Sequence, residues 1–595
     1  ILTSQSTYKL QTTVQSKKNT WIVFLRNRCI CGFPSQNHIS RNGCFLFNGI
    51  VFITNMLRIA SSALLLLQLS CLVSAQDSQS SVLTSNLLDG CVVDFEADAD
   101  IDYFPTKYSK PIIKSYGDRD IFGEKFVPHN TTDFLDISYH KTYKIVTNLH
   151  QDPPKKYLLY QCGTEIPQDV VDAGSFDLVV PVPHKGGLAL TETPQIPYVE
   201  LLGLRDDIVA YIGNPKYVTS PCMGHMMGEE AVEGRGTSIE VVYNFSIQDE
   251  LIDDFRERHP EAIIVSGPSN NVVGEQVVVS SATQERTNVA TFDWIAFFAA
   301  FYNMEGESNR IVAQMKESYD CSSDVAKFMA RESRDLAVDE DAPAPPPIAD
   351  KKKEPTIMWA NYFTYQDLQW SVGECPTWDT SYYCEYAKHC GATVLTRPAG
   401  VGMNMTWGSP TVYWYLNDEE MLAMGKDADI LIFSGNDWDN IYELKKDTLD
   451  QMKAVRNQQV FDTLGQGPSA WLEQRYAEYD VVGLDMCDIV GRAPTTGPKH
   501  ERRWFRNVFT EPVGSLGECD VKGGEISKPY VPPQQECVRP PGAVVGPLGE
   551  KAPKPPAGEV TQEAGEADAL ESAAASPSSS LVGLVSILAA IAYLM

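Results

Sequence analysis

Short apolar runs alternate with helical patterns along two stretches of this chain, and this alternation constrains its fold more than any other feature. In the first stretch, "FDLVVPVP" (176–183), "DIVAYIG" (207–213) and "EAIIVSG" (261–267) are apolar runs separated by helical patterns. In the second stretch, "PTIMWANYF" (355–363) and "ADILIFSG" (428–435) repeat the arrangement. Strand, helix and strand in repeating order predict parallel sheets covered by helices.

A long helical pattern and a polar segment lie between the two stretches. Ile311, Met315 and Tyr319 recur at i, i+4 and i+8 in a pattern of about 27 residues, which would span ~40 Å as a helix. Residues 337–355 combine acids, prolines and lysines that cannot bury a core, so they are predicted to form an exposed linker. We therefore predict an α/β fold with two Rossmann-like lobes, each built on a parallel sheet, joined by one long helix.

Local signals refine this picture. Residues 143–149 and 156–162 are predicted to pair as a hairpin, and Thr291 is predicted to cap the helix that follows it. About 500 residues are too many for one core. The expected parts are a non-native N-terminal extension (1–55), a signal peptide (56–75), an N-terminal extension of lobe 1 (76–142), lobe 1 (143–303), the linking helix (304–336), the linker (337–355), lobe 2 (356–510), a tail and stalk with cysteines and prolines (511–572), and an anchor-attachment signal (573–595).

The N-terminal region contains a secretory signal. Met56 and Arg58 precede the apolar run "ALLLLQL", and small residues at 73–75 form a cleavage site. No Asp or Glu occurs before Asp77. We expect residues 1–55 to be an extension of the gene model, and a basic, acid-poor transit peptide is the alternative.

The C-terminal region has the pattern of a lipid-anchor signal. Small residues at 572–574 and a polar spacer precede an apolar tail of 15 residues, which is short for a membrane span. We expect a GPI anchor attached at Ser572, which would hold the protein on the outer face of the plasma membrane. A short C-terminal membrane helix is the alternative, and release by a phosphatidylinositol-specific phospholipase separates the two.

Composition after residue 75 agrees with an extracellular location. The first 75 residues carry seven Lys/Arg and no acids, so the remaining chain has a net charge near −36, which repels nucleic acid and anionic membrane. An even number of cysteines in a secreted chain predicts disulfides, without giving their pairing. The disulfide candidates are Cys91, Cys162, Cys222, Cys321, Cys375, Cys384, Cys390, Cys487, Cys519 and Cys537, and the glycosylation candidates are Asn130, Asn244 and Asn404.

Six ordered segments between about residues 143 and 509 resemble one known family. They are "YLLYQCGTEIP", "VELLGLRDDIVAYIGNPKYV", "DWIAFFAAFYNMEGESNRIVAQMKESY", "ADILIFSGNDWDNI", "AVRNQQVFD" and "WLEQRYAEYDVVGLDMCDIV". Together they resemble the substrate-binding proteins of ABC importers, in the TroA-like group of periplasmic binding proteins. That group has two α/β lobes joined by one helix, and its members include receptors for ferric siderophores, haem, cobalamin and metals.

The resemblance implies ligand binding between the lobes, although the chain departs from bacterial members in several respects. The linker at 337–355, the ten cysteines and the lipid-anchor pattern are departures, and the chain carries no permease or ATPase. A small-molecule ligand and a membrane transporter or receptor are the expected partners. No cofactor is expected to be required, and the candidate ligands are a ferric chelate, haem or cobalamin.

The predicted contact residues follow the ends of strands, because ligands of open parallel sheets bind beyond the carboxyl ends of the strands. Aromatic faces suit a macrocycle or chelate, whereas Lys and Asn supply hydrogen bonds. Ordinary packing is the alternative for each aromatic residue. The candidates are His184, Lys185, Asn214, Lys216 and Tyr217 in lobe 1, and Trp359, Asn361, Tyr362, Met403, Trp407, Asn436, Asp437 and Trp438 in lobe 2.

Other chemistries have weaker support. The eight histidines after residue 75 are scattered, which disfavours a bare zinc or manganese site, so no metal site is predicted. No Gly-x-Ser-x-Gly, His-Glu-x-x-His or phosphate-loop motif occurs, so no catalytic residue is assigned. Asp437 and Asp439 could form a carboxylate pair, but helix capping explains them as well. The sequence therefore predicts an extracellular binding protein that captures a small organic or metal-chelate ligand for uptake. A surface structural or signalling protein, or an extracellular hydrolase, are the alternatives.

Overall fold

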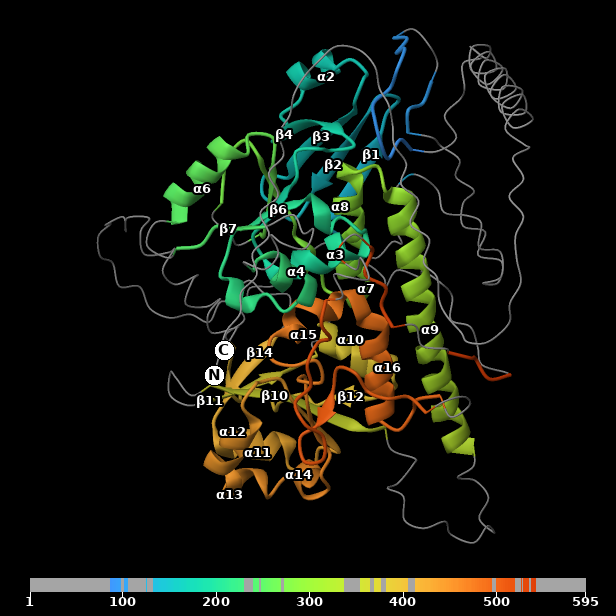
Figure 1. Ribbon diagram of the computed structural model, residues 1–595. Coiled ribbons are helices and arrows are strands. Elements are labelled where there is room, and N and C mark those ends of the chain that lie inside the picture. Colours follow the sequence, from blue (N-terminus) through green and yellow to red (C-terminus); the bar gives the residue numbers. More distant parts are fainter. Residues whose placement is uncertain are drawn as a thin grey trace, which may run out of the picture. The chain divides into compact units, whose positions relative to one another are not determined.

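The computed structural model describes the main body of the chain and leaves its two ends aside (Figure 1). The predicted signal peptide, most of the 337–355 linker and the predicted anchor site at Ser572 lie outside the described residues. In the described part of the chain, no helix is both long and apolar enough to cross a membrane. The described residues are 86–97, 101–104, 125, 132–228, 239–244, 248–268, 272–335, 354–363, 369–375, 381–404, 412–494, 499–519, 526, 528–533 and 537–541.

The fold is α/β, and lobe 1 contains two sheets. The predicted hairpin is confirmed, since the second and third strands of the first sheet pair antiparallel with Tyr143 opposite Tyr160. This sheet runs β1-β2-β3-β4, and only β3 and β4 are parallel. The short β2–β3 loop permits only an antiparallel pair, as the hairpin prediction requires, and the parallel sheet predicted for lobe 1 is the second sheet of this lobe. The elements are β1 (Leu135–Tyr139), β2 (Tyr143–Asn148), β3 (Lys155–Gln161), α2 (Gln168–Ala173) and β4 (Leu178–Val182).

The second sheet of lobe 1 is parallel throughout. Its order is β7-β6-β5-β8-β9, so the chain runs outward on one side of β5 and then returns to its other side. Helical segments connect β5 to β6, β6 to β7 and β7 to β8, as is usual for crossovers between parallel strands. The elements are β5 (Leu188–Leu190), η1 (Thr193–Gln195), α3 (Ile196–Leu201), η2 (Arg205–Asp207), β6 (Ile208–Tyr211), η3 (Pro215–Tyr217), α4 (Pro221–Met226), β7 (Glu240–Val241), α6 (Gln248–Arg258), β8 (Ile263–Ser266) and β9 (Val277–Val279).

Three helices close lobe 1 and lead toward lobe 2. The first is capped by Thr287, whose side chain accepts a hydrogen bond from the amide of Ala290, and not by Thr291 as predicted. Thr291 lies inside the helix, and its hydroxyl donates to the carbonyl of Thr287. The predicted buried face of the long helix is confirmed, because Ile311, Met315 and Tyr319 are all buried. The elements are η4 (Ala282–Gln284), α7 (Asn288–Asp293), α8 (Ile295–Phe301) and α9 (Glu305–Asp335).

Lobe 2 has a mixed sheet. Its order is β13-β14-β11-β10-β15-β16-β17, and β12 also pairs with β10. β12, β10, β15 and β16 are parallel, whereas β11, β14, β13 and β17 are antiparallel additions, so the prediction of a parallel sheet holds only for the inner strands. The strands are β10 (Thr356–Phe363), β11 (Gln369–Gly373), β12 (Thr393–Val394), β13 (Met403–Asn404), β14 (Tyr413–Leu416), β15 (Ile430–Phe433), β16 (Val460–Asp462) and β17 (Arg506–Asn507).

The helices of lobe 2 pack around this sheet and against the linking helix. The last of them, α16, packs along α9 (Figure 1). The predicted closing helix at 471–490 is divided into three consecutive elements, α15, η6 and α16. The helices are α10 (Tyr382–His389), α11 (Asp418–Gly425), α12 (Trp438–Leu444), α13 (Lys446–Leu449), α14 (Lys453–Arg456), α15 (Ala470–Glu473), η6 (Gln474–Glu478) and α16 (Tyr479–Ile489).

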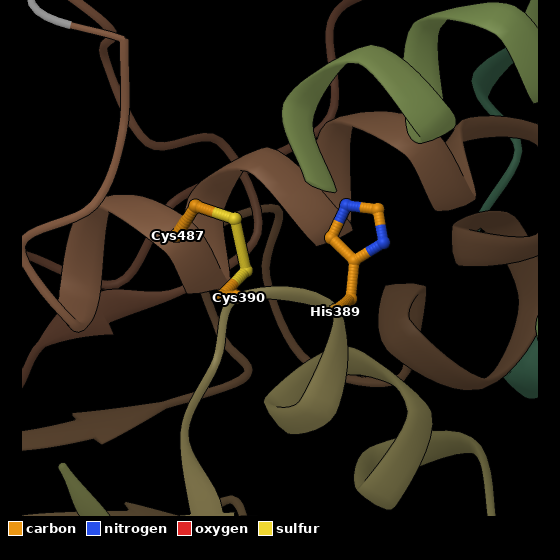
Figure 2. Close-up of side chains that lie close together, drawn as sticks. All are labelled: His389, Cys390 and Cys487. Atoms are coloured by element: carbon orange, nitrogen blue, oxygen red, sulfur yellow. A yellow bond between two sulfur atoms is a disulfide. The ribbon is translucent and has the colours of Figure 1, made fainter. Parts of the chain in front are cut away.

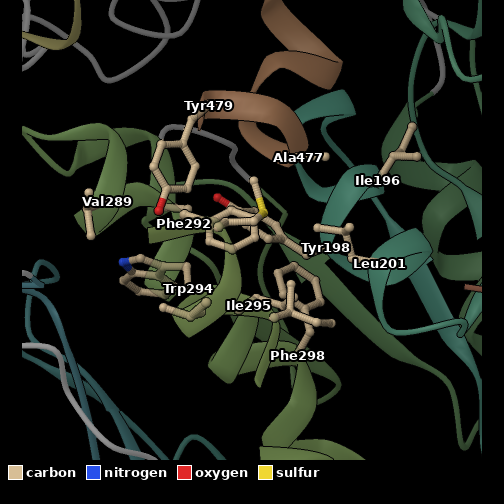
Figure 3. Close-up of a cluster of buried hydrophobic side chains, with 14 of the residues drawn as sticks. Ile196, Tyr198, Leu201, Val289, Phe292, Trp294, Ile295, Phe298, Ala477 and Tyr479 are labelled. Atoms are coloured by element: carbon tan, nitrogen blue, oxygen red, sulfur yellow. The ribbon is translucent and has the colours of Figure 1, made fainter. Parts of the chain in front are cut away.

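The two lobes share one hydrophobic core. Tyr198 and Phe292 of lobe 1 belong to the same buried cluster as Ala477 and Tyr479 of lobe 2 (Figure 3). The rings of Phe292 and Tyr479 have centroids 5.3 Å apart. Burying apolar surface between the lobes stabilises their contact by roughly 25 cal/mol per Å². The lobes are therefore joined by packing as well as by α9.

All ten cysteines predicted to form disulfides do so. Cys222–Cys519 ties α4 to the C-terminal segment, and Cys321–Cys537 ties α9 to the same segment. Arg539 also pairs with Glu317 and Asp324 on α9. The described part of the segment predicted as tail and stalk thus packs on the folded body through residue 541, because covalent and ionic contacts hold it there. The remaining pairs are Cys91–Cys162, Cys375–Cys384 and Cys390–Cys487.

Candidate functional site

Each lobe has a point where the strand order reverses, and ligands of open α/β sheets bind beyond the carboxyl ends of the strands at such points. In lobe 1 this point lies between β5 and β8, and in lobe 2 it lies between β10 and β15. In both lobes a polar side chain in or just after one strand lies over a glycine just after the neighbouring strand. The pairs are Glu192 with Gly267 and Asn361 with Gly435.

Glu192 occupies the reversal point of lobe 1. A Cβ atom at Gly267 would overlap its carboxyl group, so only glycine permits this placement. Glu192 and Gln195 form a reciprocal capping box at the start of η1. Burial raises the pKa of the Glu192 carboxyl to about 7. The group can therefore present either a hydrogen-bond donor or a negative charge near neutral pH.

Asn361 occupies the corresponding point of lobe 2. Its Oδ1 accepts a hydrogen bond of 2.8 Å from the backbone amide of Tyr362. A Cβ at Gly435 would overlap this side-chain oxygen. Asn361 lies within β10, one residue beyond the part of that strand that pairs with β15. Because Oδ1 is already used, the side-chain NH₂ group is the donor that remains for a ligand.

A pocket of about 330 Å³ lies where lobe 1 meets lobe 2. Its walls come from the loop after β6, the loop after β16 and the C-terminal segment. The hydroxyl of Thr219 is buried and has no hydrogen-bond partner among the described residues. None of the described lining residues is His, Cys, Asp or Glu, so the pocket lacks the ligands that a bare metal ion needs. The lining residues are Thr219, Pro221, Gln466, Gly467, Pro468, Gly514, Ser515, Leu516 and Gly517.

Beside this pocket, a buried carboxyl group of lobe 2 contacts lobe 1. Glu473 at the end of α15 accepts hydrogen bonds from the backbone amides of Thr219 (2.7 Å) and Ser220 (2.8 Å). Ser220 in turn donates to Glu200 at 2.5 Å, and Arg205 pairs with Glu200 at 2.9 Å. Burial raises the pKa of Glu473 to about 8. This network holds the Thr219 wall of the pocket against lobe 2.

The predicted contact residues of lobe 1 do not lie together. His184 is buried, and its Nε2 lies 3.1 Å from the carbonyl of Gly187, so its placement does not support a ligand role. Burial lowers the pKa of His184. Lys185 is exposed and pairs with Asp89. The side chain of Asn214 accepts from the amide of Lys216 and caps η3, while Lys216 is exposed and Tyr217 is partly buried.

The aromatic candidates of lobe 2 lie on opposite faces of the sheet. Trp359 faces the core shared with lobe 1 and stacks on Tyr383 with centroids 5.3 Å apart. Tyr362 belongs to a separate core and packs against Trp370. Residues of a strand alternate in direction, so these two rings cannot hold one ligand from the same face.

The remaining candidates of lobe 2 lie apart from the pocket lining. Trp438 is buried in the same core as Tyr362. Asn436 and Asp437 are exposed, and Asn440 donates to Asp437 at 2.6 Å. Asp437 is the N-cap residue of α12 but makes no side-chain capping hydrogen bond, and Asp439 lies in the first turn. Met403 belongs to β13, its side chain and all of Trp407 being outside the described part.

Most residues that line the pocket were not predicted from the sequence. Gln466 and Gly467 directly follow the short strand β16, so applying the strand-end rule to "VFDTLG" would have found them. Thr219 lies a few residues beyond the candidates chosen after β6. The C-terminal wall at 514–517 had no sequence signal, because the Cys222–Cys519 pairing brings it to lobe 1.

A cluster of His389, Cys390 and Cys487 has side-chain atoms within 4.8 Å of one another, but it is not a metal site in this state (Figure 2). Cys390 and Cys487 form a disulfide, so neither sulfur is a thiolate ligand. His389 Nε2 lies 2.7 Å from the hydroxyl of Ser322, and burial lowers its pKa to about 3. The cluster is a structural part of the α9–α10–α16 packing.

Of the glycosylation candidates, Asn244 is exposed next to β7. Asn404 lies in β13, where only the backbone is described, and Asn130 lies outside the described residues. Because Asn244 is exposed, its side chain is accessible for glycosylation.

Comparisons with known proteins return structures of one general type. The sequence matches no protein-family model, and no curated protein matches it. Similar solved structures include a possible iron-binding periplasmic protein of Staphylococcus epidermidis (12% identity, TM-score 0.32, covering 51% of this chain and 98% of that one). The periplasmic haem-binding protein of Vibrio cholerae gives 11% identity and a TM-score of 0.32, covering 50% and 96%. The vitamin B12-binding protein of the same organism gives 12% and 0.29, covering 51% and 96%. Scores this low leave the function to be argued from the site itself.

Proposed function

We propose that this protein binds a small ligand at the pocket between its two lobes. The observation that carries the proposal is the position of the pocket, which is lined by the loops after β6 of lobe 1 and β16 of lobe 2. Those loops follow the carboxyl ends of parallel strands, where α/β proteins place their ligands. Glu192 and Asn361 lie at the points where the strand order reverses. Their positions support the proposal that ligand binds at this edge of each sheet.

The chemistry of the pocket favours an uncharged or internally compensated organic ligand. Its described lining supplies glycine backbone, two prolines, the apolar Leu516 and the unpartnered hydroxyl of Thr219. A volume of about 330 Å³ is near the lower end of the usual range for ligand pockets. A metal ion would therefore enter as part of an organic chelate. We propose ferric siderophore, haem and cobalamin as the ligand classes to test, with uptake through a separate membrane protein.

We further propose that the protein acts outside the cell, held at the surface by a GPI anchor at Ser572. Five disulfides support an oxidising compartment, because such bonds are rare in the cytosol. The strongly acidic chain supports a soluble ectodomain that does not itself adhere to anionic lipid.

Calorimetric titration of the purified chain with a ferric siderophore, haem and cobalamin tests the proposal. We expect saturable binding of at least one compound, and Thr219→Val should weaken it about fivefold by removing one hydrogen bond worth about 1 kcal/mol. Valine keeps the shape of threonine and the backbone amide that Glu473 binds. Thr448→Val, on α13 and outside the pocket lining, is the control and should leave the affinity unchanged.

Binding that Thr219→Val leaves unaltered would move the ligand site elsewhere. Absence of binding by all three classes would instead favour the alternative of a structural or signalling protein. The shared core of Tyr198, Phe292 and Tyr479 is the observation that favours this alternative, because it restricts relative movement of the lobes.

A further inference from the structure

In addition to their shared core, the two lobes are joined by the same kind of polar contact in two places. In two places a carboxyl group of lobe 2, buried at Glu473 and partly buried at Glu385, accepts hydrogen bonds from backbone amides at or just before the N-terminus of a lobe 1 helix. Glu473 binds the amides of Thr219 and Ser220, and Ser220 is the N-cap of α4. Glu385 binds the amide of Asn288, which is the first residue of α7, at 2.5 Å.

The hydrogen-bonded network around Glu473 contains more carboxyl groups than cationic groups. Ser220 joins the two carboxyl groups, since its amide donates to Glu473 and its hydroxyl donates to Glu200. Arg205 is paired with Glu200, and Glu473 adds a second buried carboxyl to this network. A buried network tolerates one net negative charge poorly, and it becomes neutral when Glu473 holds a proton. The titratable groups that interact with Glu473 are Glu200 of α3 and Tyr211 of β6; Arg205 of η2 pairs with Glu200, and Arg475 of η6 lies two residues along the chain.

The Glu385 contact has the same character. The side-chain amide of Asn288 also donates to it, at 3.0 Å. Lys316 is the cation that acts on Glu385 from α9, but its ammonium pairs with Asp320 at 2.6 Å. The other titratable groups that interact with Glu385 are the hydroxyls of Tyr319 on α9, Tyr386 on α10 and Tyr479 on α16.

We propose that Glu473 and Glu385 form a pH-sensitive clamp between the lobes, closed when these carboxyls are protonated and loosened when they ionise. In the neutral state each carboxyl accepts the helix amides without leaving a charge in the interface. Ionisation places a charge in a region with few cations, which costs free energy unless water enters and the interface opens. Burial raises the pKa of Glu385 to about 7 and that of Glu473 to about 8, so the change occurs in the neutral to mildly alkaline range.

The clamp acts next to the pocket without depending on any ligand. Thr219 belongs to both, because its amide binds Glu473 and its side chain lines the pocket. The Cys222–Cys519 disulfide keeps α4 attached to the C-terminal segment when the clamp loosens. Beside the pocket, opening is thus limited to the loop at 213–221, and a ligand bound there would be released more readily at higher pH. The first part can be tested without knowing the ligand.

Hydrogen exchange of the Thr219 and Ser220 amides, corrected for the intrinsic pH dependence of exchange, tests the clamp on the intact chain. We expect their protection to fall between pH 6 and pH 9, where the ratio of ionised to neutral Glu473 rises about tenfold per pH unit. Glu473→Gln retains an acceptor oxygen and cannot ionise, so it should remove this decline. Asp480→Asn is the matched control, because burial also raises the pKa of Asp480 to about 7 but its hydrogen bond goes to Ser318 of α9.

Protection that stays constant from pH 6 to pH 9 in the native chain would overturn the clamp, as would the same decline in Glu473→Gln. If Glu473→Gln does not fold, infrared spectroscopy of the unmodified protein decides the matter. Loss of the protonated-carboxyl C=O stretch in step with the loss of amide protection supports the proposal. Its absence already at pH 6 refutes it. Neither outcome depends on ligand binding, so failure of the clamp and failure of the proposed function are distinguishable.

Discussion

Lys144 and Glu305 are both fully buried, and their contacts show how a core accommodates charge at the level of single residues. Lys144 Nζ lies 2.5 Å from Glu305 Oε1 and 2.9 Å from Asn303 Oδ1, with the ring of Phe104 5.0 Å away. Burial lowers the pKa of Lys144, and the charge of Glu305 opposes that shift. Tyr139 also donates to Glu305, so the acid at the start of α9 is fully engaged.

Substituting Lys144 with methionine should destabilise the protein by about 3–5 kcal/mol, because it leaves the Glu305 carboxylate buried without a counter-charge. Urea denaturation under oxidising conditions measures the change. The double variant Lys144→Met/Glu305→Gln should recover most of the loss. Lys155→Met, which breaks the partly exposed pair with Asp177, is the control and should cost less than about 1 kcal/mol. Equal losses for the two lysine variants would contradict this reasoning.

The packing of α16 on α9 depends on one glycine, and it illustrates the scale of whole elements. A Cβ atom at Gly483 would overlap the ring of Tyr319 on α9. Tyr319 cannot retreat easily, because it stacks on His389 with centroids 3.7 Å apart. The glycine therefore allows the two helices to approach closely at the cost of lower helix propensity.

Gly483→Ala should lower the free energy of unfolding by about 1–3 kcal/mol, since overpacking outweighs the gain in helix propensity. Gly224→Ala on α4 is the matched control, because nothing lies within 4 Å of the Cβ it would gain. That control should be neutral or stabilising by up to about 1 kcal/mol. Thermal unfolding compares the two variants, and a stable Gly483→Ala protein would show that the helices can separate without cost.

Element predictions succeeded where the pattern was local. The buried face of α9 follows from the spacing of Ile311, Met315 and Tyr319. The division of the predicted closing helix into α15, η6 and α16 was not predictable in this way. There, α15 ends at Glu473 and η6 ends at Glu478, and these side chains bind Thr219 and Arg503 from other parts of the chain.

At the scale of the whole molecule, buried ionisable groups predict how stability depends on pH. Burial raises the pKa of Glu192, Glu385 and Asp480 to about 7 and that of Glu473 to about 8. An acid whose pKa is raised by folding contributes stability that is complete below its unfolded pKa and is lost as pH rises through the folded value. These four carboxyls should therefore destabilise the protein between about pH 5 and pH 9.

His389 affects the stability of the protein at acidic pH. Burial lowers its pKa to about 3, so the unfolded chain binds its proton more readily and stability falls as pH drops below about 6.5. Together the groups predict greatest stability at mildly acidic pH, near 5.5–6.5. Urea midpoints measured from pH 4 to pH 9 test this expectation, and a midpoint that rises steadily toward pH 9 would refute it.

Only part of the candidate site was predictable from the sequence. Asn361 was chosen as a residue at a strand end, but β10 continues to Phe363, and its side chain lies over Gly435 after the neighbouring strand β15. His184 and Trp438 also lie near strand ends, yet both are buried, Trp438 in a hydrophobic core and His184 against the carbonyl of Gly187. A strand-end position gives the edge of the sheet, but it does not say whether a side chain points into a pocket or into a core.

By itself, the sequence determined the α/β class, the linking helix and the presence of disulfides, because hydrophobic periodicity and cysteine number are properties of short segments and of composition. The tertiary structure decided that the lobes share a core, that Cys222 pairs with Cys519, and that residues 514–517 complete the pocket. Such contacts join residues up to 297 positions apart, and their free energy depends on which surfaces meet after folding. For the same reason the Glu473 contact with lobe 1 emerges only from the folded chain.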